Sequence, residues 1–182
     1  MDTLGFVELS SIAGGIEIAD AMLKTAHIKL IFAKASCPGK YYVLINGQVS
    51  NVEKAVKAGT DMAGGFLVSS LVLPRVHRKV VLAINMGGEI PEKLDAIGVM
   101  EFFSVTSSLI AADIAVKASP VELLDVRLGT GIGGKSFVVV AGDTSAVKTA
   151  IESAAFSLKD DGMLVNKVVI SRPDKNLLAN LL

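Results

Sequence analysis

The chain has 182 residues, enough for one large domain or two small ones, and its 18 Lys and Arg residues balance 18 Asp and Glu residues. With 51% hydrophobic and 20% charged residues, it is neither a disordered chain nor a nucleic-acid binder that works through a basic surface. The longest uncharged stretch, Met62 to Pro74, is shorter than the roughly 20 residues of a membrane-spanning helix. Asp2 and Glu8 do not fit a secretory signal peptide. We therefore expect a cytoplasmic protein without nucleic-acid or membrane partners, whose excess apolar surface is buried between subunits.

The two halves of the chain repeat each other. Leu4–Glu8 (LGFVE) returns as Ile97–Glu101 (IGVME), at an offset of 93 residues. After a two-residue insertion, Gly39-Lys40 returns as Gly134-Lys135. We expect two tandem domains, residues 1–90 and 91–182, joined at the Gly- and Pro-containing segment 87–91.

Each half contains the same predicted elements in the order β-α-β-β-α-β, which indicates an α+β fold with helices on one side of an open sheet. In chain order, the predicted strands of the first copy are Leu4–Leu9, Ile28–Lys34, Tyr41–Ile45 and Leu67–Leu73. Those of the second copy are Ile97–Phe102, Val121–Arg127, Phe137–Ala141 and Leu164–Ile170.

Two helices are predicted in each copy. Ile12, Ile16, Ala19 and Leu23 share one face of the first helix of the first copy, and Val105, Leu109, Ala112 and Val116 repeat this pattern in the second copy. The second helix of the first copy is predicted to start at Ser50, with Glu53 completing a capping box. Its counterpart is predicted at residues 145–158.

Cys37 is the only cysteine, so no disulfide can form within the chain and a reducing compartment is expected. It lies in the predicted loop Ser36-Cys37-Pro38-Gly39. A lone cysteine is most often a small buried hydrophobic residue, but loops carry function. One thiol cannot hold a metal, whereas symmetry-related thiols from several chains can form an iron–sulfur or zinc site. Both interpretations remain open from the residues alone.

The segment Gly129–Ser136 (GTGIGGKS) matches the phosphate-binding P-loop pattern. That motif binds phosphate when the loop opens a helix. Here the apolar run from Phe137 predicts a strand, so a tight glycine-rich turn is favoured over a nucleotide site.

Several charged residues recur in both copies. Lys24 and Lys117 lie near the ends of the first helices, where they either complement the helix dipole or make contacts between assemblies. Glu8 with Glu101, and Asp20 with Asp113, also recur, but no partner completes a triad or an acid–base pair. His27 and His77 receive no role, and we expect no enzymatic activity.

Together, these motifs resemble the bacterial microcompartment (BMC) shell domain. The resemblance rests on the repeated Leu4–Glu8 and Ile97–Glu101 segments, the paired Asp-x-x-x-Lys motifs, the Gly-Lys loops and the closing Arg172-Pro173. It covers nearly the whole chain, twice. It implies the tandem-domain class, in which three chains form a pseudohexameric tile with a central pore.

The resemblance also implies roles for individual residues. The residues implied to line the pore are Ser36, Cys37, Pro38, Gly39, Gly131, Ile132, Gly133 and Gly134. Those implied to pack tile edges are Lys24, Lys117, Arg75 and Arg172. The implied partners are other copies of the chain in a homotrimer, other BMC shell proteins at the tile edges, and an encapsulated or cytosolic redox enzyme.

The loop around Cys37 is similar to the pore loop of the tandem shell protein of propanediol-utilisation compartments. This similarity implies that Cys37 from three chains ligates one [4Fe–4S] cluster per trimer, for electron transfer or cluster supply across the shell. A purely structural tile with a metabolite-conducting pore is the alternative, followed by the nucleotide-binding interpretation of Gly129–Ser136.

Overall fold

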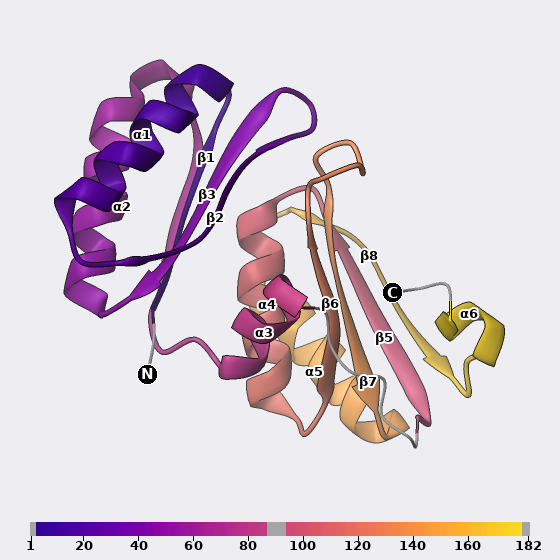
Figure 1. The fold of residues 1–182 in the computed structure, drawn as a ribbon. Coiled ribbons are helices and arrows are strands. Elements are labelled where there is room, and N and C mark those ends of the chain that lie inside the picture. Colours follow the sequence, from indigo (N-terminus) through magenta and orange to yellow (C-terminus); the bar gives the residue numbers. More distant parts are fainter. Residues whose placement is uncertain (1–2, 87–93, 180–182) are drawn as a thin grey trace. The chain divides into compact units, whose positions relative to one another are not determined.

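The computed structural model describes residues 3–86 and 94–179. The chain divides into two compact units, and along the sequence the main boundary falls between Val76 and His77 (Figure 1). The domain boundary that we predicted between residues 90 and 91 lies outside the described residues.

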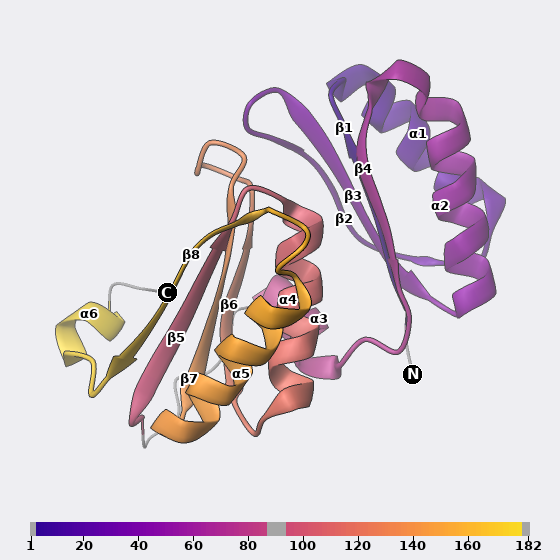
Figure 2. The ribbon, with the colours of Figure 1, turned by 180° about the vertical axis from the view of Figure 1, so that it is seen from behind.

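The first unit has the predicted element order. Its elements are β1 (Thr3–Leu9), α1 (Ile12–Thr25), β2 (Lys29–Ser36), β3 (Lys40–Gly47), α2 (Val49–Ala63), a short 3-10 helix η1 (Gly64–Phe66) and β4 (Leu67–Leu73). The strands form one antiparallel sheet in the order β2-β3-β1-β4. Helices α1 and α2 lie side by side on one face of this sheet (Figures 1 and 2).

The second unit repeats this arrangement. Its elements are α3 (Arg78–Met86), β5 (Ala96–Phe102), α4 (Val105–Ala118), β6 (Glu122–Leu128), β7 (Ser136–Gly142), α5 (Thr144–Ser157), β8 (Leu164–Ser171) and α6 (Lys175–Ala179). The antiparallel sheet has the order β6-β7-β5-β8, and α4 and α5 pack against it. The predicted α+β class with two copies of one domain is therefore confirmed.

The glycine of the repeated first-strand motif is explained by helix packing. A Cβ atom added at Gly5 would lie 2.7 Å from Val52 Cγ1 of α2, and one added at Gly98 would lie 2.6 Å from Ile151 Cγ1 of α5. Real Cβ atoms do not approach other atoms so closely, so each glycine lets a helix rest directly on the central strand. This close approach sets the helix-covered face in both copies.

The face of α1 that packs on the sheet differs from our prediction. The helix buries Gly15, Ile18, Ala19 and Met22, whereas three of the predicted core residues are exposed, namely Ile12 at 43%, Ile16 at 56% and Leu23 at 39%. Gly15 belongs to the packed face because Tyr41 of β3 fills the space where its Cβ would be. The helix thus carries one apolar face for its own sheet and a second apolar stripe on its exposed side.

Two other details of the helices differ from the sequence prediction. Helix α2 begins at Val49 with Gln48 as its N-cap and no side-chain capping bond, so the Ser50–Glu53 capping box is absent. Helix α3 was not predicted at all. It packs on β6 and α4 through buried Val80 and Ala83.

Among the described residues, no helix combines the length and apolar character needed to cross a membrane.

Candidate functional site

Cys37 lies at the tip of the hairpin formed by β2 and β3. Ser36 ends β2 and pairs with Lys40, the first residue of β3, so only Cys37, Pro38 and Gly39 form the connection. Gly39 has a φ of +73°, a left-handed conformation that favours glycine in such a tight turn. The Cys37 side chain is partly exposed and forms no disulfide. The predicted loop position of the thiol is therefore confirmed, while its role as a pore ligand stays a prediction.

The matching loop of the second unit joins β6 to β7 and is longer, with residues 129–135 between the two strands. Gly129, Gly131, Gly133 and Gly134 all have positive φ, between 66° and 82°. Strand β7 starts at Ser136, so the loop opens a strand and not a helix. Without helix N–H groups to receive phosphate, the P-loop interpretation is wrong. Ile132 lies in this loop, which lacks a thiol.

An ion pair lies at the base of each loop. Lys40 Nζ is 2.5 Å from Glu8 Oε1 in the first unit, and Lys135 Nζ is 3.0 Å from Glu101 Oε1 in the second. The Ser69 hydroxyl also donates a hydrogen bond to Glu8 Oε2. No role for these glutamates was predicted from the sequence, although their recurrence together with the Gly-Lys motifs was the signal that could have paired them. The pairs tie the central strand of each sheet to the start of β3 or β7, and so fix where each loop begins.

Two buried hydroxyl groups lie beside the Cys37 loop without a hydrogen-bond partner among the described residues. They are Ser36 Oγ and Tyr42 Oη, on side chains that are 7% and 0% exposed, respectively. Burial raises the pKa of the Tyr42 phenol above its usual value, and the Ser36 hydroxyl, which lies close enough for a side-chain hydrogen bond, opposes this in part. The Tyr42 ring meets Phe6 edge to face, with ring centroids 5.5 Å apart.

The donor set of a single chain does not make a metal site. Within the described part of the chain, no three His, Cys, Asp or Glu side chains gather where they could hold a metal ion. Cys37 is the one cysteine of the sequence, and iron–sulfur clusters are held mainly by cysteine thiolates. A cluster at this loop therefore requires the same loop from several chains, which agrees with the chemistry inferred from the sequence.

The two predicted edge lysines have different surroundings. Lys24 pairs with Asp20 on the exposed side of α1. Lys117 pairs with Asp113, whose side chain is only 6% exposed and also accepts a hydrogen bond from the backbone N–H of His77, just before α3. The second pair thus holds the start of α3 as well as presenting a lysine at the surface.

The predicted edge arginines follow β4 and β8. Both Arg75 and Arg172 are exposed, with φ values of +54° and +49°. A left-handed conformation is uncommon for arginine, and its presence at the same place in both copies shows that the turn geometry is repeated. Their contacts with other tiles stay a prediction.

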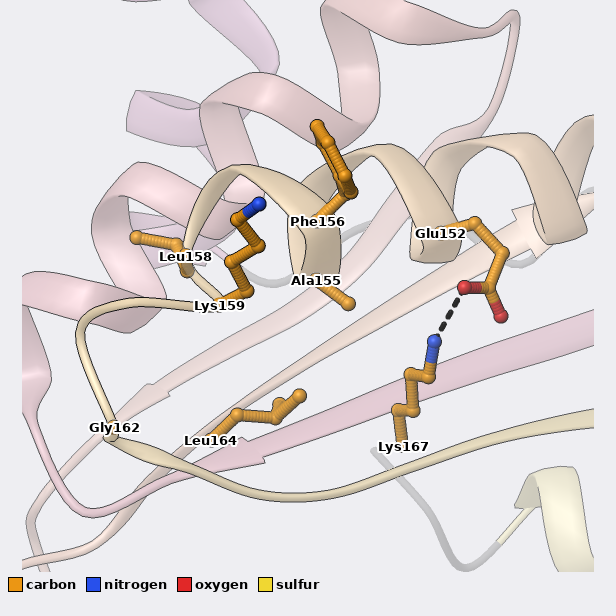
Figure 3. Close-up of a pocket in the computed structure, with 8 residues that line it drawn as sticks. All are labelled: Glu152, Ala155, Phe156, Leu158, Lys159, Gly162, Leu164 and Lys167. Carbon is orange, nitrogen blue, oxygen red and sulfur yellow. Dashed lines mark hydrogen bonds and ion pairs between the residues drawn. The ribbon is translucent and has the colours of Figure 1, made fainter.

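The second unit also contains a surface pocket of about 460 Å³ between the end of α5 and the start of β8 (Figure 3). Phe156 on its rim is 70% exposed, and Lys159 Nζ lies 4.6 Å from the centroid of its ring. Lys167 forms an ion pair with Glu152 across the pocket. This pocket was not predicted from the sequence. Its charged side chains pair with their neighbours in the wall and form no acid–base pair.

Comparison with known proteins identifies the repeated unit. The BMC domain model matches residues 3–76 and, a second time, residues 96–173. The chain belongs to the BMC domain family. The BMC shell protein PduT of Citrobacter freundii is 45% identical over 174 residues, which cover 96% of this chain and 94% of that protein.

Two further similarities describe the BMC repeat and its fold. The carboxysome shell protein CsoS1 of Prochlorococcus marinus is 36% identical over 93 residues, which are 50% of this chain and 90% of that protein. The match therefore spans half of this chain but nearly the full length of CsoS1. The crystal structure of a microcompartment protein from Desulfitobacterium hafniense DCB superposes with a TM-score of 0.93 at 44% identity, covering 98% of this chain and 99% of that one.

Proposed function

We propose that this chain is a structural shell protein of a bacterial microcompartment, whose homotrimer places three Cys37 thiols around a central pore to bind one [4Fe–4S] cluster. The observation that carries the proposal is a thiol at the tip of a hairpin loop in only one of two BMC copies. The 45% identity to PduT, a microcompartment shell protein, supports the shell role. Such a cluster would supply electron transfer across the shell, or would be delivered to an enzyme inside it.

The surface of the first unit supports assembly with other copies. The exposed stripe Ile12, Ile16 and Leu23 on α1 continues at Leu30 of β2, which is 37% exposed. In the second unit, α3 packs over β6, and the matching residue Leu123 is only 4% exposed. Apolar residues left open beside an edge strand are typical of subunit interfaces. We assign this surface to contacts between chains of the trimer.

The Cys37 loop has the chemistry that such a cluster needs. Three chains would bring three Cys37 thiolates, the type of ligand that holds iron–sulfur clusters. The short hairpin holds each thiol, and the Glu8–Lys40 pair at its base fixes the strand from which the loop projects. Ile132 takes the corresponding place in the second copy, so the pore would carry three ligands and not six.

The edge residues support lateral assembly. Lys24 and Lys117, with Arg75 and Arg172, are exposed cations at matching places in both copies. We assign them to contacts with neighbouring BMC shell proteins. A redox enzyme inside the compartment or in the cytosol is the proposed electron partner of the cluster.

Anaerobic purification tests the function of the loop. The protein is expected to be brown and to give an electron paramagnetic resonance signal after reduction, and both properties should be lost in a Cys37→Ala variant that remains trimeric. Colourless protein that cannot be reconstituted with iron and sulfide would reject the cluster and leave a structural tile with an open pore. A Cys37→Ala variant that still binds the cluster would reject Cys37 as its ligand.

A further inference from the structure

Two open apolar surfaces of the described chain lie on different units. On the first unit, exposed apolar residues of α1 continue onto the edge strand β2. We call this the α1/β2 surface and define it by Ile12, Ile16, Leu23 and Leu30. At an offset of 93 residues, Ile16 corresponds to Leu109 and Leu30 corresponds to Leu123, which are 0% and 4% exposed. The positions that are open in the first unit are therefore buried in the second.

The second open surface is the face of the second unit's sheet that points away from α4 and α5. Gly98 of β5 points to α5, because a Cβ atom there would meet Ile151, so its neighbour Val99 points to the opposite face. Val168 of β8 pairs with Val99, and Ile170 lies on the same face two residues further along β8. Val168 and Ile170 are 41% and 37% exposed. We call this the β5/β8 face.

The edge of the β5/β8 face is apolar. Lys167 lies between the two exposed β8 residues but points to the helix side of the sheet, where it forms an ion pair with Glu152 of α5. Leu178 of α6 packs against the buried cluster around Ile97, and the two β8 side chains are exposed all the same. An apolar face at the edge of a sheet is typical of a surface that a partner covers.

The matching face of the first unit is more buried. Phe6 corresponds to Val99 and is 0% exposed, whereas Val99 is half-buried. At an offset of 97 residues, Leu71 corresponds to Val168 and is half-buried, whereas Val168 is exposed. The two kinds of surface are therefore open in opposite copies of the repeat, the helix surface in the first unit and the sheet face in the second.

One open surface of each kind is what a ring of identical chains requires. A contact between two like surfaces has two-fold symmetry and ends at a dimer, whereas a contact between different surfaces leaves one of each free and can close into a ring of three. Both surfaces run along an edge strand, β2 in the first sheet and β8 in the second. Both present exposed aliphatic side chains, so that docking would remove apolar area from water on each side.

We propose that the α1/β2 surface of one chain docks on the β5/β8 face of the next chain, in a head-to-tail contact that repeats three times around the trimer. This inference rests on the proposed homotrimer and adds to it the partner of the α1/β2 surface. That partner is a sheet face of the second unit, and not the α1/β2 surface of another copy.

The test uses two variants of the full-length chain that each damage one surface and leave the other intact. Ile16→Asp places a carboxylate in the α1/β2 surface, and Val168→Asp places one in the β5/β8 face. Val68→Asp is the matched control, because Val68 is 45% exposed on β4, an edge strand of the first sheet, and belongs to neither surface. Circular dichroism and thermal unfolding show that each variant is folded, and sedimentation measures its assembly.

We expect Ile16→Asp and Val168→Asp each to sediment as a monomer, and Val68→Asp to sediment as the wild-type trimer. A 1:1 mixture of Ile16→Asp and Val168→Asp should form a species of two chains, one of each kind. The first variant supplies an intact β5/β8 face and the second an intact α1/β2 surface, so that one contact forms and the ring cannot close.

Two results would overturn the inference while a trimeric wild type leaves the proposed function intact. Folded Val168→Asp that assembles without the other variant, as a trimer or as a dimer, would show that the β5/β8 face is not the partner of the α1/β2 surface. A mixture of the two folded variants that stays monomeric would show that the intact surfaces do not bind each other. A monomeric wild-type protein would overturn both the inference and the homotrimer on which it rests.

Discussion

At Gly98, a single missing Cβ atom decides how closely helix and sheet can pack. A Cβ there would meet two atoms of Ile151 and one of Val147 within 2.8 Å, whereas at Gly65 it would meet nothing within 4 Å. The repeated Leu-Gly and Ile-Gly motifs therefore have a structural explanation that is independent of any family. The same cannot be said of Cys37 or Tyr42, whose residue types are not required by the packing of their unit.

Replacement of Gly98 by alanine should lower the free energy of unfolding by about 1–3 kcal/mol, because a well-packed helix must move to admit the new methyl group. Gly65→Ala is the control and should change it by less than about 0.5 kcal/mol. Urea unfolding followed by circular dichroism measures both. Equal unfolding midpoints for the two variants would contradict the close-packing explanation.

We expect the folded protein to lose stability in alkaline solution because of Tyr42. Its pKa in the folded protein is raised by burial, so above about pH 10 the unfolded chain loses this proton more readily than the folded one. The stabilisation is fully present below the unfolded pKa and is lost as the pH rises through the folded pKa. Thermal unfolding between about pH 8 and pH 11 should show a fall in the midpoint that is smaller in Tyr42→Phe than in Tyr41→Phe. Identical falls in the two variants would contradict this role of Tyr42.

At the scale of elements, periodicity and the internal repeat predicted every strand of both sheets and the four main helices. They did not predict which face of α1 packs on the sheet. Ile12, Ile16 and Leu23 have the spacing of a core stripe, yet they are exposed, because a helix with apolar residues on two faces gives no sequence signal for which one is internal. Helix α3 was missed, although Val80 and Ala83 have the i, i+3 spacing of one helical face and are the residues that it buries against β6 and α4.

A matched pair of substitutions can distinguish the roles of the two faces of α1. Ile16→Asn alters a residue that is 56% exposed, and Ile18→Asn alters one that is 4% exposed on the same helix. We expect Ile16→Asn to keep its secondary structure and to sediment as a smaller species than the wild type. Ile18→Asn should instead unfold at lower temperature, since a core polar group costs several kcal/mol. An Ile16→Asn protein that assembles like the wild type would exclude the stripe from the subunit interface.

The candidate site was predicted only in part, because contacts between residues that are distant in the sequence leave no local pattern. The sequence placed Cys37 in a loop and suggested that several chains must share a metal. It did not pair Lys40 with Glu8, because these residues lie on different strands and 32 positions apart. Nor did it reveal the unpaired hydroxyls of Ser36 and Tyr42, since burial and missing partners are properties of the folded hairpin.

At the scale of the whole molecule, the duplication lets matching positions acquire different tasks. Asp20 and Lys24 form an exposed pair, whereas Asp113 is buried and holds the start of α3 in addition to Lys117. One copy carries the thiol of Cys37, and the other carries a glycine-rich loop. A tandem chain can thus build a ring with three unusual positions, which six identical domains cannot do.

The edge lysines provide a test of lateral assembly. Lys24→Ala removes an exposed pair and should leave stability unchanged within about 0.5 kcal/mol, while reducing the extended sheets seen by negative-stain electron microscopy. Lys117→Ala should both reduce sheets and lower stability by about 1–3 kcal/mol, because it leaves the buried Asp113 carboxylate without its cation. Sheets of wild-type extent in both variants would exclude these lysines from the tile edge.

If three chains share one cluster through Cys37, native mass spectrometry of anaerobically prepared protein should detect it. We expect a species with the mass of three chains plus one [4Fe–4S] unit, and a Cys37→Ala trimer with the mass of three chains alone. A wild-type trimer without the added mass after reconstitution, or an equal addition in Cys37→Ala, would rule out a cluster shared through Cys37.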